Sequence, residues 1–255
     1  MKTIVLQVKG LSKYFGGLKA LDNVNFKLFS QEILGILGPN GAGKTVCFNL
    51  ICGDYKPTHG EMAFNGQRID GLLPHEIASL GIGRTFQIVK PFSSLTVLEN
   101  VLVARGIMRY KSFSKIWSIW KSPTEKKAAL EVLEHVGLAD LASRKAGLLP
   151  LGNLRRLEIA RALVVGSKLI LLDESFSGLR PEEIAKMERL IQDIRKDGIT
   201  VLLIEHNMRV AMGICDRIIV LDHGRKIAEG APESIQQDEN VIEAYLGKRT
   251  YANAA

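Results

Sequence analysis

Residues 38–45 read Gly-Pro-Asn-Gly-Ala-Gly-Lys-Thr, and this stretch decides the fold. It fits the pattern G-x-x-x-x-G-K-[ST], follows an apolar run at residues 32–37 and precedes a helical segment from about Gly43, which is the context of a phosphate-binding loop. Glycines let successive N–H groups converge on a phosphate, and the helix presents its positive N-terminus to the same anion. The stretch therefore predicts a nucleotide site. The residues expected to contact ATP phosphates are Gly38, Asn40, Gly41, Gly43, Lys44 and Thr45.

A second motif supplies the carboxylates that such a site needs. Four apolar residues at 169–172 are followed directly by Asp173 and Glu174. Ligands of open α/β sheets bind at the carboxyl ends of the strands, so both carboxylates are expected to face the nucleotide. Asp173 and the Thr45 hydroxyl are predicted to hold Mg²⁺, which prefers oxygen ligands, while Lys44 reaches the β- and γ-phosphates. Glu174 is predicted to accept the proton of the attacking water, which predicts ATP hydrolysis.

The hydrophobic pattern of the rest of the chain indicates an α/β fold. Apolar and polar residues alternate at 2–8 and 24–28, as in antiparallel strands with one buried face. Residues 97–165 lack strand signals and show helical periodicity, which predicts a helical lobe. A parallel sheet is expected from buried-type strands that alternate with helical segments. These strands are 169–172, 200–204 and 217–221, with a helix at 181–196.

Composition indicates an ordinary folded protein. The 255 residues are 46% hydrophobic and 24% charged. The longest apolar runs fall far short of the roughly 20 residues that span a bilayer, and the first ten residues carry no cleavage site, so a cytosolic chain is expected. Cys47, Cys52 and Cys215 form no C-x-x-C pair and are predicted to be buried thiols. The net charge of +7 fits nucleic acid or an anionic membrane equally well and excludes neither.

With these motifs in this order, residues 4–247 resemble the ABC ATPase family. Gln87, which ends the run Arg-Thr-Phe-Gln, matches the family's Q-loop, and His206, in Leu-Ile-Glu-His-Asn, matches the switch histidine that contacts the γ-phosphate. Phe15 matches the aromatic residue that stacks on adenine, and the adjacent Tyr14 is the alternative. The resemblance implies the catalytic residues Glu174, His206 and Gln87 and the Mg²⁺ ligands Thr45, Gln87 and Asp173.

The resemblance also implies an architecture. It is an α/β P-loop NTPase (RecA-like) core with an N-terminal antiparallel β subdomain and an inserted α-helical subdomain. We expect a single ABC ATPase domain at 1–250. In it, 1–86 and 165–235 form the β subdomain and the nucleotide-binding core, 87–164 form the helical subdomain with the signature, and 236–255 form a C-terminal tail.

Three segments are similar to the ATPases of branched-chain amino acid uptake systems. They are Leu-Thr-Val-Leu-Glu-Asn-Val at 95–101, the long basic insert near 105–121, and Val-Ile-Glu-Ala-Tyr-Leu-Gly at 241–247. Lipopolysaccharide-export ATPases share several of these features and are the alternative. DNA-repair and ribosome-acting relatives are disfavoured, because they carry long coiled coils or two nucleotide domains, whereas this chain has neither.

This likeness implies how the chain works and with what. It implies an ATP-binding and hydrolysing subunit that powers an ABC importer by ATP-driven dimer closure. The implied partners are a second ABC ATPase subunit, transmembrane permease subunits and, indirectly, a substrate-binding protein, with no nucleic acid. The implied location is peripheral, at the cytoplasmic face of the inner (plasma) membrane.

One motif departs from the family. The signature, Leu-Ser-Tyr-Gly-Gln in this branch, is here Leu-Pro-Leu-Gly-Asn, so Pro150 replaces the serine and Asn153 replaces a longer glutamine, while Gly152 is kept. The family serine donates its hydroxyl and N–H to a γ-phosphate across the dimer, and proline has neither donor. Ser175 likewise replaces the proline that usually follows Glu174, and the D-loop residues 176–180 differ from the family.

These changes fall at the expected dimer contact, where each ATP lies between one subunit's phosphate loop and the other's signature. The hypothesis is an asymmetric pair, in which this chain hydrolyses ATP when a partner supplies an intact signature. A homodimer would carry two weakened sites. The alternative is a low-turnover regulatory subunit that only binds ATP.

Overall fold

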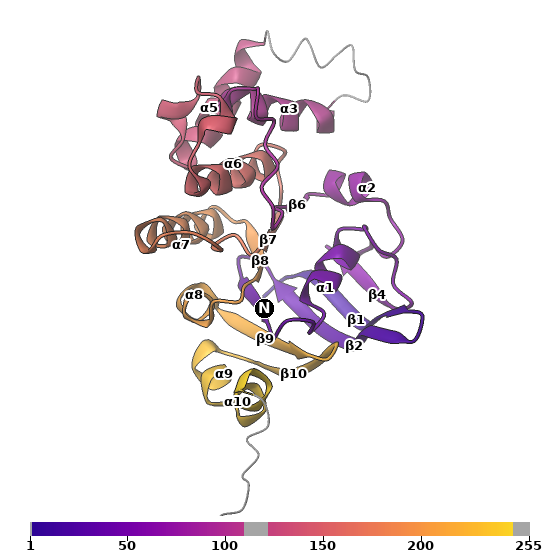
Figure 1. Cartoon of the computed structure of the whole chain (residues 1–255). Helices are drawn as coiled ribbons and strands as arrows, with labels where there is room; N and C mark the ends of the chain where they lie inside the picture. Colours follow the sequence, from indigo (N-terminus) through magenta and orange to yellow (C-terminus); the bar gives the residue numbers. More distant parts are fainter. Residues whose placement is uncertain (1, 110–121, 247–255) are drawn as a thin grey trace, which may run out of the picture. The chain divides into compact units, whose positions relative to one another are not determined.

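The computed structural model describes residues 2–109 and 122–246 and consists of two compact units (Figure 1). The first unit combines the two ends of the chain, Met1–Ile77 and Thr200–Ala255, and the second is Ala78–Ile199. Most of the basic insert predicted near 105–121 lies outside the described residues. In the described ranges, no helix is long and apolar enough to cross a membrane.

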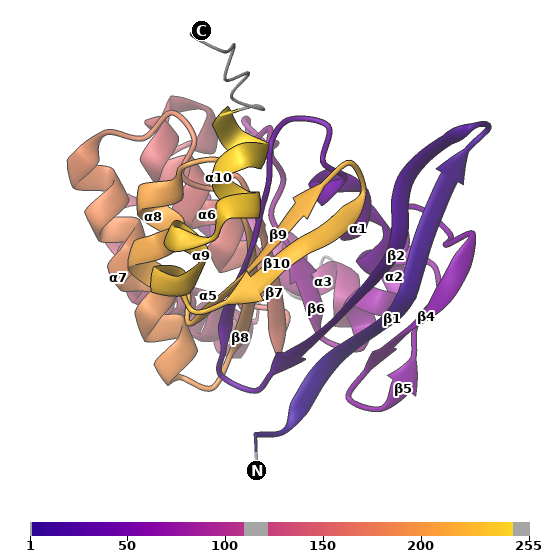
Figure 2. The same ribbon diagram turned by 90° about the horizontal axis from the view of Figure 1, so that it is seen from below.

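The first unit contains the antiparallel sheet expected from the sequence (Figure 2). Its strand order is β2-β1-β4-β5. Alternating residues face the core, and this period of two explains why the segment forms strands. The strands β1 and β2 are longer than predicted, because polar side chains on the open face continue the alternation beyond the apolar residues. The bounds are β1 (Ile4–Phe15), β2 (Leu18–Phe29), β4 (His59–Phe64) and β5 (Gln67–Arg68).

The first unit also contains four strands of a second sheet, in the order β10-β9-β3-β8. The central strand β3 runs parallel to both β8 and β9, and all residues of β3 and β8 are buried, as continuous apolar runs predict for parallel strands. The strands are β3 (Ile33–Leu37), β8 (Thr200–Ile204), β9 (Arg217–Asp222) and β10 (Arg225–Gly230). The helices are α1 (Lys44–Ile51), α8 (Met208–Ile214), α9 (Pro232–Gln237) and α10 (Glu239–Leu246).

The second unit is mostly helical. Its two strands, β6 and β7, pair in parallel, and β7 is buried over its whole length. The helix α5 begins at an N-cap serine, Ser122, whose side chain accepts from the Glu125 amide, and continues with a proline at the first helical position. The strands are β6 (Ile82–Arg84) and β7 (Leu169–Asp173). The helices are α3 (Val97–Arg109), α5 (Pro123–His135), α6 (Leu151–Leu163) and α7 (Pro181–Lys196), with α2 (Pro74–Ser79) at the boundary of the units.

The α/β fold predicted from the sequence is confirmed, with its antiparallel sheet, parallel strands and helical lobe. The helix predicted at 181–196 has those bounds in α7. The edge strand β10 was not predicted, because its residues are half-buried or exposed and carry no apolar alternation. Cys47, Cys52 and Cys215 are free, buried thiols as expected, and burial raises the pKa of Cys47 to about 12.

Candidate functional site

The loop between β3 and α1 encloses the side chain of its own lysine. Lys44 is buried, and its Nζ donates to the carbonyl oxygens of Gly38 at 2.6 Å and Pro39 at 2.9 Å. Two backbone carbonyls therefore hold the ammonium group at the N-terminus of helix α1. A cation held in this way is ready to meet an anion at the helix N-terminus.

Glycine is required where the loop begins and where it becomes helical. Gly38 has φ +146°, and a Cβ there would lie 2.1 Å from the carbonyl oxygen of Leu221. Gly43, the N-cap of α1, has φ +100°, and its Cβ would lie 2.5 Å from the carbonyl oxygen of Ala20. Any side chain at either position would displace neighbouring backbone, which explains the spacing of these glycines. Between and after them, Asn40, Gly41 and Thr45 are exposed and accessible to a ligand.

The acidic motif lies at the end of β7, in the second unit. Asp173 is almost completely buried, and its Oδ2 accepts a hydrogen bond of 2.9 Å from the Nη2 of Arg84. Glu174 is also buried and has φ +49°, in the left-handed region that side chains other than glycine rarely adopt. Such backbone strain concentrates at functional sites, and here it sets the direction of the carboxylate that was predicted as the base.

The segment after β6 lies along this acidic motif. The Nε2 of Gln87 donates to the Oε2 of Glu174 at 2.9 Å, so the sequence-predicted pair is in direct contact. The hydroxyls of Thr85 and Ser175 lie 3.1 Å apart, and the backbone N–H of Asp173 donates to the Thr85 hydroxyl at 3.3 Å. Residues on the segment therefore pair with each of three consecutive positions of the acidic motif. Ser175, which replaces the family's proline, therefore has a hydrogen-bond partner, and a proline side chain could not form this bond.

His206 follows β8 in the first unit and is exposed. The next residue, Asn207, caps helix α8, because its side-chain oxygen accepts from the backbone amides of Arg209 at 3.1 Å and Val210 at 3.4 Å. The cap fixes the turn in which the histidine lies. This places an imidazole at the carboxyl end of a buried parallel strand, where ligands of such sheets bind.

The two candidate aromatic residues at the end of β1 differ in their surroundings. The Tyr14 hydroxyl donates to Asp22 Oδ1 at 3.1 Å, and its ring packs edge-on against His59 with centroids 5.7 Å apart. Phe15 is 43% exposed and packs edge-on against Tyr55 with centroids 5.4 Å apart. Phe15 thus presents more free ring surface than Tyr14.

The altered signature forms the start of helix α6 in the second unit. Pro150 is the N-cap and is exposed, and it offers the helix no side-chain acceptor. Gly152 is buried, and a Cβ there would lie 2.5 Å from the Oε1 of Glu183. The Oδ1 of Asn153 accepts a 2.6 Å hydrogen bond from the Nη2 of Arg156. The side chain that replaces the family's glutamine is therefore bound to its own helix.

The body of α6 is more firmly held than its start. Arg155 is buried and donates from Nη1 to the carbonyl oxygen of Phe86 at 2.9 Å, next to Gln87. Glu158 lies one turn further along the helix, and burial raises its pKa to about 7 although Arg155 opposes this shift. The signature helix and the Q-loop segment are thus joined by a buried arginine.

The predicted residues fall into two groups, one in each unit. The first unit holds the phosphate loop, His206 and Phe15, and the second brings Asp173, Glu174 and Gln87 together beside the signature helix. Sequence reasoning did not find the partners Arg84 and Thr85, or Tyr245 of α10, whose hydroxyl accepts a hydrogen bond of 2.8 Å from the N–H of Gly38. Arg84 and Thr85 lie three and two positions before the predicted Gln87, and that proximity was the available signal.

The features described so far define the class of P-loop nucleotide-binding proteins. They are a strand, a glycine-constrained loop around a lysine, a helix, and a buried strand that ends in two acidic residues. The sequence model of the family "ABC transporter" matches residues 21–177, and that of "Branched-chain amino acid ATP-binding cassette transporter" matches residues 225–250. The chain belongs to the ABC transporter family, as its ATP-binding cassette ATPase. The resemblance predicted from the motifs is confirmed.

Curated relatives match over nearly the whole chain. The high-affinity branched-chain amino acid transport ATP-binding protein LivG of Escherichia coli K12 is 43% identical over 97% of this chain and 100% of its own. The corresponding protein BraF of Pseudomonas aeruginosa is 40% identical, with the same coverage.

Solved structures agree with this assignment. A nucleotide-free ATP-binding cassette from an ABC transporter superposes with a TM-score of 0.87 at 33% identity, covering 96% of this chain and 100% of that one. A dimeric bacterial ABC transporter cassette superposes with a TM-score of 0.76 at 30% identity, covering 89% and 98%.

Proposed function

We propose that this chain powers a branched-chain amino acid importer, as one of two ATPase subunits that close around ATP and move membrane-embedded permease subunits. The observation that carries the substrate class is the match of residues 225–250 to the branched-chain amino acid cassette model. That match lies outside residues 21–177, which the general family model covers, and it favours this importer over the lipopolysaccharide-export alternative.

The geometry in the second unit supports the proposed catalytic roles. Glu174 accepts the proton of the attacking water, and its strained backbone together with the Gln87 amide holds the carboxylate in one direction. In the first unit, Lys44 and the loop amides bind the phosphates, and His206 donates to the γ-phosphate. Phe15 stacks on adenine, because its ring is the more exposed of the two candidates.

Mg²⁺ fits the donor atoms available. Thr45 offers a hydroxyl, Asp173 a carboxylate and Gln87 an amide oxygen, and Mg²⁺ prefers oxygen ligands of this kind. The Gln87 nitrogen already faces Glu174, so its oxygen is the atom left for a metal. When bound, the ion would neutralise the negative charge that develops on the phosphates.

The partners follow from the family and the altered signature. We place the chain at the cytoplasmic face of the inner membrane, bound to permease subunits that receive amino acids from a substrate-binding protein. Its own phosphate loop is served by a partner's signature, whereas Pro150 and Asn153 face the partner's ATP. Pro150 has neither hydroxyl nor N–H to offer that γ-phosphate, so an asymmetric heterodimer is favoured.

The test is ATP hydrolysis by the chain alone, with its candidate partner ATPase, and with permease and binding protein in vesicles. The blank is the Glu174→Gln variant, which should keep ATP binding and lose turnover by about 10²–10⁴-fold. We expect turnover only with the partner, and stimulation by leucine, isoleucine or valine.

The other outcomes are equally informative. Full turnover by the purified homodimer would contradict the weakened site at Pro150. ATP binding without turnover in any combination would instead identify a regulatory subunit. Turnover that responds to a lipopolysaccharide-type substrate and to no amino acid would overturn the substrate class.

A further inference from the structure

A tyrosine of the C-terminal helix forms a hydrogen bond with the phosphate loop. The backbone N–H of Gly38 donates to the hydroxyl of Tyr245, on α10, at 2.8 Å. The tyrosine is half-buried, and burial raises its pKa. Its position lies within residues 225–250, the stretch matched by the branched-chain amino acid cassette model and not by the general one.

Gly38 is a critical position for such a contact. Its carbonyl oxygen accepts from the Nζ of Lys44 at 2.6 Å, so one residue receives the lysine on one side and the C-terminal tyrosine on the other. Gly38 has φ +146°, and a Cβ at this position would lie 2.1 Å from the Leu221 carbonyl oxygen, so the backbone has little room for another conformation. The Tyr245 hydroxyl therefore holds the Leu37–Gly38 peptide, which directly precedes the peptide whose carbonyl oxygen accepts from the lysine.

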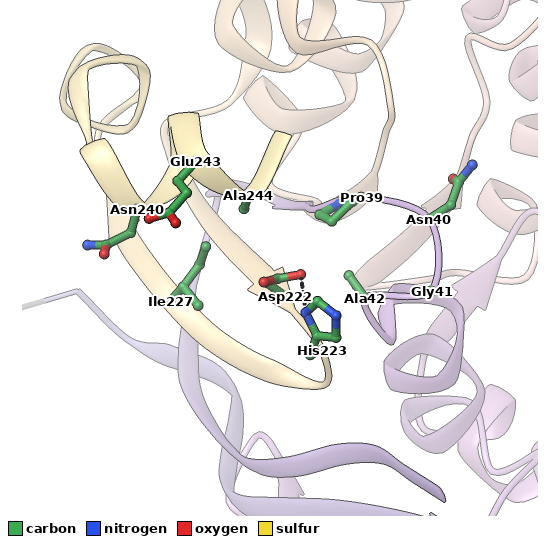
Figure 3. Close-up of a pocket in the computed structure, with 10 residues that line it drawn as sticks. All are labelled: Pro39, Asn40, Gly41, Ala42, Asp222, His223, Ile227, Asn240, Glu243 and Ala244. Carbon is green, nitrogen blue, oxygen red and sulfur yellow. Dashed lines mark ion pairs between the residues drawn. The ribbon is translucent and has the colours of Figure 1, made fainter. Parts of the chain in front are cut away.

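The rest of α10 stands away from the loop. A cavity of about 650 Å³ is lined on one side by the outer surface of the loop, from Pro39 to Ala42, and on the other by Asn240, Glu243 and Ala244 of α10 (Figure 3). The helices themselves are anchored, because Ile235 of α9 and Val241 of α10 are each only 2% exposed. Beside this cavity, the tyrosine hydroxyl connects an anchored helix directly to the loop.

We infer that Tyr245 is a positioning residue for the phosphate loop, and that its hydrogen bond to Gly38 sets the nucleotide affinity of this chain. The inference rests on the proposed ATP binding. The hydroxyl holds the peptide that enters the loop, next to the carbonyls of Gly38 and Pro39 that accept from Lys44, so the loop is partly ordered before ATP binds. A helix outside the stretch that the general family model matches thereby tunes a motif common to the whole family.

The experiment uses the full chain and the variant Tyr245→Phe, which keeps the ring and removes only the hydroxyl. Affinity for ATP and ADP is measured by titration calorimetry, and the exchange rate of the Gly38 amide by NMR without nucleotide. We expect both nucleotides to bind roughly 2- to 10-fold more weakly and the Gly38 amide to exchange faster by a similar factor, the range typical of one hydrogen bond. Ser234→Ala is the matched control, because its hydroxyl bonds to the Ala231 carbonyl at 2.8 Å in the same segment, and it should change neither value.

Unchanged affinity and exchange in Tyr245→Phe would overturn the inference. The wild-type chain gives a second test that needs no variant, since a Gly38 amide that exchanges as fast as the exposed Gly41 amide would also overturn it. Failure of the wild-type chain to bind ATP would contradict the proposed function. That result is distinct, because the exchange of Gly38 is read without nucleotide.

Discussion

The phosphate loop and the signature segment are two parts of this chain that we propose to bind nucleotide, and they differ in how they are held. In the loop, Lys44 binds two carbonyls and Gly38 and Gly43 permit no side chain, so the chain itself fixes these three positions of the motif. At the signature, Pro150 begins a helix without a side-chain cap, and Asn153 bonds to its own helix. The loop matches its motif at each position, whereas the signature does not.

The difference indicates which changes this fold tolerates. A substitution in the loop would disturb the packing of the chain that carries it, because Leu221 and Ala20 leave no space beside the glycines. An exposed N-cap such as Pro150 can change without that effect, since in the proposed pair its substitution alters only a contact with the partner's nucleotide. The comparison therefore predicts large effects on this chain's ATP at the loop and gains for the partner's ATP at the signature.

Between the loop and the signature, the largest effect is expected from Lys44→Ala. Removal of the ammonium group takes a preorganised positive charge from the β- and γ-phosphates, and loss of one such donor costs about 10²–10³-fold in turnover. The measurement is ATP hydrolysis by the complete transporter, with ATP affinity measured separately. Lys127→Ala, at an exposed lysine on α5, is the control and should leave both unchanged. Equal turnover in the two variants would contradict the expected role of the loop lysine.

Repair of the signature should give an intermediate gain. Pro150→Ser restores a hydroxyl and an N–H for the partner's γ-phosphate, and hydrogen bonds to charged groups contribute about 1.5–3 kcal/mol, or roughly 10- to 100-fold in turnover. The backbone already has the extended conformation of an N-cap, with φ −59° and ψ 157°, so serine also caps α6. The measurement is steady-state ATP hydrolysis by the purified homodimer.

Pro150→Ala separates the two restored groups, because it returns the N–H without the hydroxyl. Its turnover should lie between those of the wild-type chain and Pro150→Ser. Turnover that stays unchanged in both variants would mean that the signature is not what limits a homodimer.

The sequence predicted the parts of this site that are encoded locally. The loop spacing, the apolar strand before Asp173 and the helix at 181–196 are patterns of neighbouring residues, and each was found. The pairs Arg84 with Asp173 and Gly38 with Tyr245 join positions 89 and 207 residues apart, and no local pattern encodes such a contact. They depend on how the strands and the C-terminal helix pack, which one sequence does not specify.

The smallest effect is expected at Ser175, which also differs from the family but is buried. Ser175 is 1% exposed, and its hydroxyl lies 3.1 Å from the Thr85 hydroxyl. It therefore contributes one buried hydrogen bond between the acidic motif and the Q-loop segment. Ser175→Ala should therefore cost about 1 kcal/mol of unfolding free energy and lower Tm by about 2–4 °C. Calorimetric unfolding of the purified chain measures the shift.

Ser177→Ala is the matched control, since that serine is exposed and should unfold at the wild-type temperature. The comparison of Ser175 with Pro150 is the more informative one. Both positions depart from the family, but the Ser175 side chain is bonded within this chain and that of Pro150 is not, so Ser175→Ala should change stability, whereas Pro150→Ala, which adds no side-chain cap, should change turnover. If Ser175→Ala left Tm unchanged while Pro150→Ala altered it strongly, the distinction between a departure held by this chain and one that faces a partner would be wrong.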